Sequence, residues 1–287
     1  MTTTTPHASR RTRIHTIHGG GGVRLHVREW GPADAPPVVL IHGLSQDHQC
    51  WVRQYQGPLT DDFRLVAFDL RGHGMSEAPT DPAAFADGKL WADDLAAVID
   101  QLGLDHAVLV GWSYGPFVIG DYLRAYGDSK IDALAFVGGA VRLGPAAFGS
   151  LIGPGFLDHF ADLTAEDLPT SIRGVRGLVH AFAAHPLPTE NIETLLCAAM
   201  AVPATIRGAM GARDVDYDDV LRNLRLPLLV SHGRSDSVVL PAMAQHVLNV
   251  CPTAEVSWYD GVGHVPFLER PDRFNGELVA LIRRSRD

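Results

Sequence analysis

Short, continuous runs of apolar residues recur along the chain, separated by polar or glycine-rich loops. A run of this kind is typical of a β-strand that is buried on both faces of a sheet. Two runs near the start alternate only partly between apolar and polar residues, and Gly19 to Gly22 lie between them, which indicates a β-hairpin. The hairpin strands are expected at 12–17 and 23–30, and the buried strands at 36–43, 64–72, 106–113, 132–139, 226–233 and, more weakly, 255–261.

Amphipathic stretches lie between these runs, with apolar residues spaced three and four positions apart as on one face of an α-helix. One of them ends at Gly103, a residue type that is common at the C-terminal cap of a helix. Strands that alternate with helices form β–α–β units, so we predict an α/β fold with a mostly parallel central sheet and helices on both faces. The helical stretches are 88–103, 115–127, 241–250 and 270–284.

The alternation stops at about residue 143, and we find no convincing strand before about residue 222. This segment instead carries several helical patterns separated by glycine and proline. A helical insertion between two strands would lie over one edge of the sheet as a cap, with apolar residues that either line a substrate pocket or pack the cap onto the sheet domain. We predict a core domain of residues 11–142 and 223–287, a helical cap of residues 143–222, and a disordered N-terminus at residues 1–10.

Composition narrows the functional classes. The 287 residues are 46% hydrophobic and 20% charged, with a net charge of −9 and basic clusters only near the two ends. This balance argues against nucleic acid or an anionic membrane as a partner. The three cysteines are too few and too far apart to suggest a disulfide framework, and the sequence has neither a signal peptide nor an apolar run long enough to span a membrane. We therefore expect a cytoplasmic protein that acts on a small molecule, with an oligomeric state that the sequence leaves open.

The clearest chemical motif is Gly-Trp-Ser-Tyr-Gly at residues 111–115, between a predicted strand and a predicted helix. The pattern Gly-x-Ser-x-Gly in this context places a serine at the tip of a sharp turn, and the glycines allow neighbouring backbone to come close. The five-residue pattern alone arises by chance in about one such sequence in ten. Its position between strand and helix makes Ser113 a candidate nucleophile.

An activated serine needs a base, and the base needs an acidic partner that orients it. Asp236 follows the strand at 226–233, and His264 follows the strand at 255–261. Taken singly, each residue has an ordinary explanation, since Asp236 could cap a turn or helix and His264 is one of 14 histidines. The order Ser113, Asp236, His264, with each residue after a strand, is the order in which this elbow architecture uses its catalytic triad.

With these motifs in place, the chain resembles the α/β-hydrolase superfamily over nearly its whole length, in the branch with a serine nucleophile and a helical cap. The matching stretches are LIHGLSQDHQCW, FDLRGHGMSEAP, VGWSYGPF, SHGRSDSVV and GVGHVPFLERP. The resemblance implies an oxyanion hole formed by the backbone N–H groups of Leu44 and Tyr114. It also implies that His42, Asp69, Arg71 and His73 brace the loops around the site rather than transfer protons. Gly43, Trp112, Val238 and Val265 are the residues we expect to contact substrate.

The resemblance implies a cofactor-free serine hydrolase that cleaves a carboxylic ester or a related acyl bond of a small, largely apolar substrate. Lactonase, carbon–carbon-bond hydrolase, perhydrolase and amidase activities remain open on the same triad. A non-catalytic ligand-binding protein is a further alternative, because fold alone does not fix function. The segment HGLSQDHQCW is also similar to cofactor-independent quinolone dioxygenases, but in that group an acidic residue follows the strand that corresponds to 132–139, and here no Asp or Glu does.

A second histidine–glycine segment, HGGGG at 18–22, also spells an oxyanion-hole signature. It lies between the hairpin strands, whereas the signature must follow the central strand that ends at the active-site edge, where HGLS stands at 42–45. We interpret 18–22 as a turn and expect alanine at Gly20 and Gly21 to change stability only slightly. The sequence shows no metal-ligand motif and no phosphate-binding glycine loop, so we expect neither a metal nor a cofactor.

Overall fold

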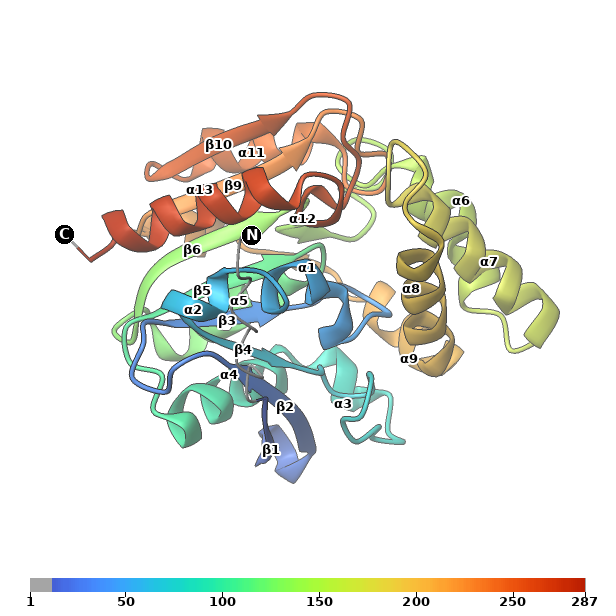
Figure 1. Cartoon of the computed structure of the whole chain (residues 1–287). Helices are drawn as coiled ribbons and strands as arrows, with labels where there is room; N and C mark the ends of the chain where they lie inside the picture. Colours follow the sequence, from blue (N-terminus) through green and yellow to red (C-terminus); the bar gives the residue numbers. More distant parts are fainter. Residues whose placement is uncertain (1–11, 287) are drawn as a thin grey trace, which may run out of the picture.

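A computed structural model describes residues 12–286 and contains an eight-stranded sheet in the order β1-β2-β4-β3-β5-β6-β9-β10 (Figure 1). The strands from β4 to β10 in this order are parallel, and the antiparallel hairpin of β1 and β2 joins the sheet at β4. The strands are β1 (Arg13–His18), β2 (Arg24–Trp30), β3 (Pro37–Ile41), β4 (Arg64–Phe68), β5 (Ala107–Trp112), β6 (Ile131–Val137), β9 (Leu228–Gly233) and β10 (Ala254–Tyr259). The predicted α/β fold, with its mostly parallel sheet, is confirmed.

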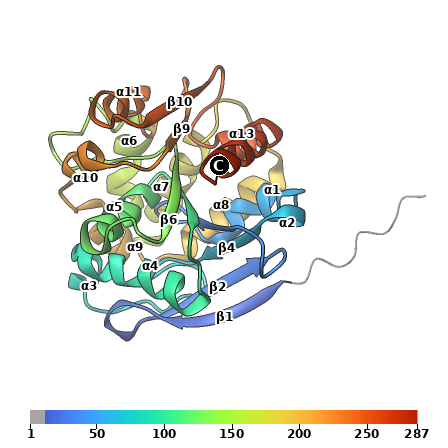
Figure 2. The ribbon, with the colours of Figure 1, turned by 90° about the vertical axis from the view of Figure 1, so that its left-hand side faces the viewer.

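Helices cover both faces of the sheet: α4, α5 and α11 lie on one side, and α13 lies with α1 and α2 on the other (Figure 2). Central strands β3 and β5 are buried along their whole length, which explains why their sequences are continuous apolar runs. Helix α4 ends where the sequence predicts, because Gly103 adopts the left-handed conformation that caps it. The helices outside the inserted segment are α1 (Val52–Tyr55), α2 (Leu59–Asp62), α3 (Ala83–Ala86), α4 (Gly88–Leu102), α5 (Gly115–Tyr126), α10 (Asp218–Asn223), α11 (Pro241–Val250), α12 (Pro266–Glu269) and α13 (Pro271–Arg284). Two short 3₁₀ turns are η1 (Gly20–Gly22) and η2 (His48–Trp51).

The glycine segment closes the β1–β2 hairpin as expected, but it is not a loose turn. The N–H of Gly20 donates to Asp94 (2.8 Å), and the carbonyl of Gly20 accepts from Arg71 (3.0 Å). A Cβ at Gly20 would lie 2.6 Å from the carbonyl oxygen of Leu90 on α4. The expectation that alanine at Gly20 changes stability only slightly is therefore wrong, because the turn is packed into a buried ion pair and against a helix.

The inserted helices gather beside the sheet at the end where the loops after β3, β5 and β9 lie (Figure 1). Two short strands join the chain where it leaves and re-enters the core, with Arg142 paired to Asp216 and Leu143 paired to Val215. The sequence pattern did not predict this pairing, because two-residue strands are too short to show a periodicity. The elements are β7 (Arg142–Leu143), α6 (Pro154–Leu163), α7 (Leu168–Ala181), α8 (Thr189–Ala201), α9 (Ala204–Gly211) and β8 (Val215–Asp216).

Other expectations concern the ends and the cysteines. The N-terminal residues 1–10, expected to be disordered, lie outside the described residues. The three cysteines are free. Within residues 12–286 no single helix has the length and apolarity of a membrane span, and α8 and α9, which pass that test only as a pair, are bent by 89° at their junction.

Candidate active site

Ser113 stands at the turn between β5 and α5 with a backbone φ of 56°, a left-handed conformation that is uncommon outside glycine. The turn is fixed on both sides, since the N–H of Ser113 donates to the carbonyl of Val137 and its carbonyl accepts from Ala140. A Cβ at Gly115 would lie 2.7 Å from the carbonyl oxygen of Ile41, so the turn packs directly against the end of β3. This is the strained strand-to-helix geometry that presents a serine hydroxyl at a sheet edge.

Asp236 and His264, which are 28 residues apart in sequence, form a buried hydrogen-bonded pair. His264 Nδ1 donates to Asp236 Oδ2 at 2.8 Å, and Asp236 Oδ1 accepts the N–H groups of Val238 and Val239 at 2.9 and 3.0 Å. Three N–H donors therefore fix the orientation of the carboxylate. The pair leaves the second ring nitrogen of His264, Nε2, free to accept a proton.

His264 Nε2 is buried and has no hydrogen-bond partner among the described residues. The structure therefore does not join Ser113 Oγ and His264 Nε2 by a hydrogen bond. The two residues are linked through Trp112, which precedes the serine and whose indole N–H donates to the carbonyl of His264 at 3.0 Å. Nucleophile–base hydrogen bonds are often long in unliganded sites and tighten when substrate binds.

The loop that carries His264 is attached to the segment after α7 by residues that sequence reasoning did not single out. The N–H of His264 donates to the carbonyl of Phe182 at 2.6 Å, and the two rings lie 5.6 Å apart. Glu269 accepts the N–H of Gly263 and the N–H of Ala184, so one carboxylate joins the histidine loop to the segment after α7. Glu269 follows His264 by five residues, but no sequence motif indicated that its carboxylate joins the two segments.

Gly138, at the end of β6, lies directly beside the histidine–aspartate pair. A Cβ there would be 2.9 Å from His264 Nδ1 and 3.2 Å from Asp236 Oδ2. Any larger residue at this position would displace the pair. An acidic side chain at the end of β6, where the quinolone dioxygenases carry one, would therefore fit only if the Asp236–His264 pair moved.

The loop after β3 is held by two buried, neutral histidines. His42 Nε2 accepts the N–H of Leu70, and its Nδ1 donates to the carbonyl of Gly43. His73 Nε2 accepts the N–H of Ser45. Burial, together with the nearby His73, lowers the pKa of His42 to about 3, and burial lowers the pKa of His73 to about 4. Both rings therefore stay uncharged at neutral pH and act as fixed acceptors and donors, which supports their interpretation as bracing residues.

Asp69 and Arg71 brace the loop after β4. Arg71 forms a two-pronged ion pair with Asp94, with both distances 2.7 Å. Asp69 Oδ1 accepts the N–H and the ring Nδ1–H of His48, and Oδ2 accepts the N–H of Met75. Burial alone would raise the pKa of Asp69, but these bonds and the charge of His48 bring it down to about 2.

Asp69 also belongs to a group of potential metal ligands that the sequence did not suggest. His26, His48 and Asp69 each place one ligand atom within 4.8 Å of the others. Among the described residues these are the ones that could hold a metal ion. Both Asp69 oxygens already accept hydrogen bonds from the protein, which favours a bracing role for this cluster.

A narrow, almost wholly apolar pocket opens beside Ser113. Leu44 and Tyr114, the expected oxyanion-hole residues, line it together with Val238, which is expected to contact substrate, and Phe156 from α6. Its volume is about 40 Å³. The lining residues are Leu44, Ser113, Tyr114, Phe117, Ala140, Leu143, Ile152, Phe156, Gly211, Val238 and Val239.

The other residues expected to contact substrate lie elsewhere. A Cβ at Gly43 would be 2.9 Å from Ser113 Cβ, so this glycine lies against the serine itself. Trp112 and Val265 are fully buried and are not part of the pocket wall. Trp112 packs behind the serine against Phe267, in addition to its contact with His264. Its indole supports the histidine instead of facing the pocket.

Tyr114 is tied to the chain that leaves the cap. Its hydroxyl accepts a hydrogen bond from Arg213 (3.1 Å), and the same guanidinium pairs with Asp121 on α5 (2.9 Å). Tyr217 donates to the same carboxylate at 2.6 Å. This buried network fixes the side chain of the residue that follows Ser113. No sequence pattern indicated this network, because its members lie far apart along the chain.

The chain is similar to known proteins over most of its length. The sequence model of the alpha/beta hydrolase family matches residues 38–277. An esterase from Rhodococcus sp. ECU1013 is 34% identical, with a TM-score of 0.89 over 94% of this chain and 98% of that chain. An esterase from Exiguobacterium antarcticum is 25% identical, with a TM-score of 0.83 over 93% and 98%. A bifunctional esterase/perhydrolase from Acinetobacter calcoaceticus is 28% identical over 91% of this chain and 97% of its own length.

Proposed function

Because the chain belongs to the alpha/beta hydrolase family and is an enzyme of that family, we propose that it cleaves carboxylic ester or related acyl bonds with a Ser113–His264–Asp236 triad. One observation carries the proposal. Ser113 stands at a strained left-handed turn and lines an apolar pocket. The buried His264–Asp236 pair is joined to the same turn by the hydrogen bond from Trp112 to His264. The esterases named above have similar folds along almost their whole lengths.

In this mechanism Ser113 Oγ attacks the carbonyl carbon of the substrate while His264 Nε2 takes the hydroxyl proton. Asp236 keeps the proton of the neutral ring on Nδ1 and stabilises the imidazolium that forms. His264 then gives its proton to the leaving alcohol. A water molecule that His264 activates attacks the acyl-enzyme, and the acid is released with Ser113 restored.

The backbone N–H groups of Leu44 and Tyr114 donate hydrogen bonds that stabilise the negative charge developing on the carbonyl oxygen. Both residues line the pocket of Ser113. Fixed amide donors of this type stabilise the transition state by about 3–4 kcal/mol each, because they need no reorganisation during the reaction. His42 and His73 hold the loop of Leu44 on one side, and the Arg213 network holds Tyr114 on the other.

The pocket favours a small, largely apolar acyl group. Its wall has almost no polar surface apart from the serine, and Phe156 from α6 forms part of it. A volume of about 40 Å³ is far below the several hundred Å³ of sites that enclose drug-sized ligands. We infer that short acyl chains fit directly, and that lactones or carbon–carbon bonds are cleaved only if the same pocket holds their acyl part. We further propose that residues 143–222 act as the cap of this pocket and that the protein is cytoplasmic.

The direct test is hydrolysis of p-nitrophenyl esters of increasing acyl length by the wild type and by two variants of the serine. Ser113→Ala removes the hydroxyl, and Ser113→Gly removes it with a residue that tolerates the observed φ of 56° without strain. We expect both to lose activity by about 10⁴-fold or more while keeping the wild-type Tm. Turnover that persists in either variant would contradict the proposal.

A further inference from the structure

Glu269, the last residue of α12, joins the histidine loop to the inserted helices through both of its carboxylate oxygens. Oε1 accepts the N–H of Gly263 at 2.7 Å, and Oε2 accepts the N–H of Ala184 at 3.1 Å. Gly263 directly precedes His264, whereas Ala184 belongs to the segment between α7 and α8. We call this carboxylate with its two N–H donors the Glu269 bridge, and the triad proposed above gives it no role.

The two segments pack closely where the Glu269 bridge joins them. A Cβ at Gly263 would lie 2.7 Å from the carbonyl oxygen of Phe182 and 2.8 Å from the backbone nitrogen of Ala184. The same Phe182 carbonyl accepts the N–H of His264 at 2.6 Å. Because backbone atoms of both segments are in contact, a shift of residues 182–184 is passed on to the main chain of His264.

The main chain of His264 is fixed from two sides. Its N–H donates to Phe182, and its carbonyl accepts the indole N–H of Trp112 at 3.0 Å. The rings of Phe182 and Trp112 meet edge to face, with centroids 5.3 Å apart. Trp112 directly precedes Ser113, so the position of the base relative to the nucleophile depends on both attachments. His264 Nε2 has no partner within residues 12–286, so no hydrogen bond to Ser113 fixes that position instead.

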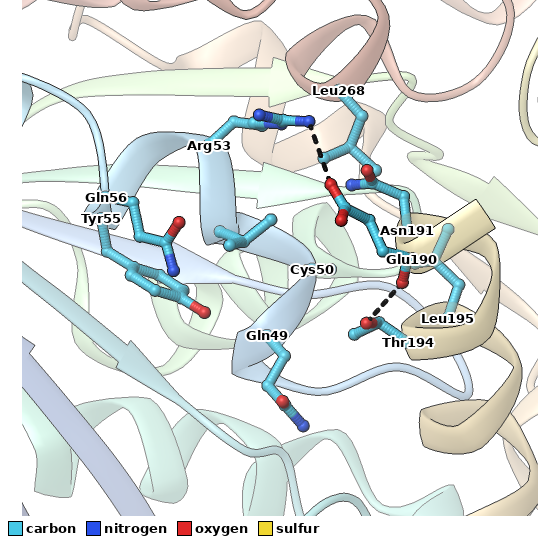
Figure 3. Close-up of a pocket in the computed structure, with 11 residues that line it drawn as sticks. Gln49, Cys50, Arg53, Tyr55, Gln56, Glu190, Asn191, Thr194, Leu195 and Leu268 are labelled. Carbon is cyan, nitrogen blue, oxygen red and sulfur yellow. Dashed lines mark hydrogen bonds and ion pairs between the residues drawn. The ribbon is translucent and has the colours of Figure 1, made fainter. Parts of the chain in front are cut away.

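Near the bridge, the contact between the inserted helices and the core is partly hollow. A cavity of about 360 Å³ separates part of α8 from the core segment of η2 and α1, and Leu268, the neighbour of Glu269, lines it (Figure 3). At this cavity Arg53 and Glu190 lie 3.9 Å apart, but their side chains are 44% and 81% exposed, and exposed ion pairs stabilise little. The Glu269 bridge therefore reinforces an interface that packing alone does not fill.

We propose that Glu269 is a positioning residue for the general base: its carboxylate fixes residues 182–184 against the histidine loop and so keeps His264 Nε2 within reach of Ser113. Glu269 does not line the pocket of Ser113, so it acts through His264. Displacing a catalytic group by about 1 Å costs about 10²-fold in rate. The inference rests on the triad proposed above and adds a further side chain on which the reaction depends.

Two substitutions weaken the bridge to different degrees. Glu269→Gln keeps the size of the side chain but offers one acceptor oxygen, because the amide nitrogen only donates. Glu269→Met removes both acceptors. With p-nitrophenyl acetate we expect kcat to fall by about 10-fold in the Gln variant and by about 10²-fold in the Met variant. KM is expected to stay within about twofold of the wild type, since the pocket of Ser113 is untouched. The Gln variant keeps the measurement possible if the Met variant does not fold.

A double-mutant cycle with His264→Ala separates positioning from a general structural role. His264→Ala leaves the residual hydrolysis that the oxyanion hole and substrate binding supply. If Glu269 acts through His264, the Gln and Met substitutions leave that residual rate unchanged. A carboxylate that only stabilises the fold changes kcat by the same factor in both backgrounds, and this result would overturn the proposal.

Glu29→Gln is the matched control. Glu29, on β2, is 1% exposed and accepts from Arg13 (2.7 Å) and Arg64 (2.6 Å), so this substitution also breaks hydrogen bonds of a buried glutamate. We expect a lower Tm and wild-type kcat per folded molecule, counted by active-site titration. Wild-type kcat in both Glu269 variants, with activity that His264→Ala strongly reduces, would overturn the positioning role alone. Full activity in His264→Ala would overturn the triad as well.

Discussion

Two histidine–glycine segments of this chain have similar sequences and different surroundings. His18 is exposed, and its ring makes a single long contact of 3.5 Å to the carbonyl of Gly22 at the end of the β1–β2 hairpin. His42 is fully buried after the central strand β3, and both of its ring nitrogens form hydrogen bonds. Gly20 packs against Arg71 and α4, whereas Gly43 packs against Ser113. A short motif thus takes its role from the strand that precedes it and from the edge of the sheet where that strand ends.

The two segments should separate activity from stability. In the first, the glycines allow the hairpin to close around a buried ion pair. In the second, the glycine gives the serine its space. Substitutions in the two segments therefore test the comparison directly, and the expected effects differ in kind as well as in size.

The largest effect is expected from Gly43→Ala. The new Cβ would lie 2.9 Å from Ser113 Cβ and 3.3 Å from Trp112, so the serine or the N–H of Leu44 must shift. We expect kcat/KM for short p-nitrophenyl esters to fall by about 10²–10³-fold, as when one oxyanion donor is lost, while the free energy of unfolding falls by about 1–3 kcal/mol because the site is overpacked. Wild-type kcat/KM in this variant would show that the loop of 42–45 does not shape the site.

Gly20→Ala is expected to change stability alone. Its Cβ would meet the backbone oxygen of Leu90 at 2.6 Å, and we expect the free energy of unfolding to fall by about 1–3 kcal/mol. Activity per folded molecule, counted by active-site titration, should stay at the wild-type value. Gly103→Ala is a useful control because a Cβ there has open space around it, so its cost comes only from the positive φ of 60°. A large loss of kcat in Gly20→Ala would mean that the hairpin turn, and not the loop after β3, serves the active site.

The third prediction is a pH dependence of stability. In the unfolded chain His42 and His73 take up protons near pH 6.5, whereas their folded pKa values are about 3 and about 4. The unfolded state therefore binds more protons at low pH, and stability present above about pH 6.5 is lost as the pH falls, by about 1.4 kcal/mol per pH unit for each histidine. Urea unfolding between about pH 6.5 and pH 4.5 measures this slope. His73→Gln should reduce it, and His18→Gln at the exposed position should not; equal slopes in all three proteins would contradict the bracing role.

The comparison also shows what the sequence was able to predict. The central strands were predictable because burial on both faces makes them continuous apolar runs. The order of Ser113, Asp236 and His264 followed from the loops after β5, β9 and the half-buried edge strand β10. The packing of Gly20 was not readable, because it depends on Arg71 and Asp94, which are distant in sequence. The direction of the Trp112 side chain was equally hidden, since alternation along a strand does not say which buried group its indole will meet.

Whether Ser113 is the nucleophile is decided by trapping a stable analogue of the acyl-enzyme. The protein is incubated with paraoxon, an organophosphate that phosphorylates activated serines, and the site of modification is located by mass spectrometry of the peptides. If Ser113 is the nucleophile, one diethylphosphoryl group per chain will be found on Ser113, and esterase activity will be lost in proportion to labelling. The Ser113→Gly variant will not be labelled. Label on another residue, or complete inhibition without label on Ser113, would contradict it.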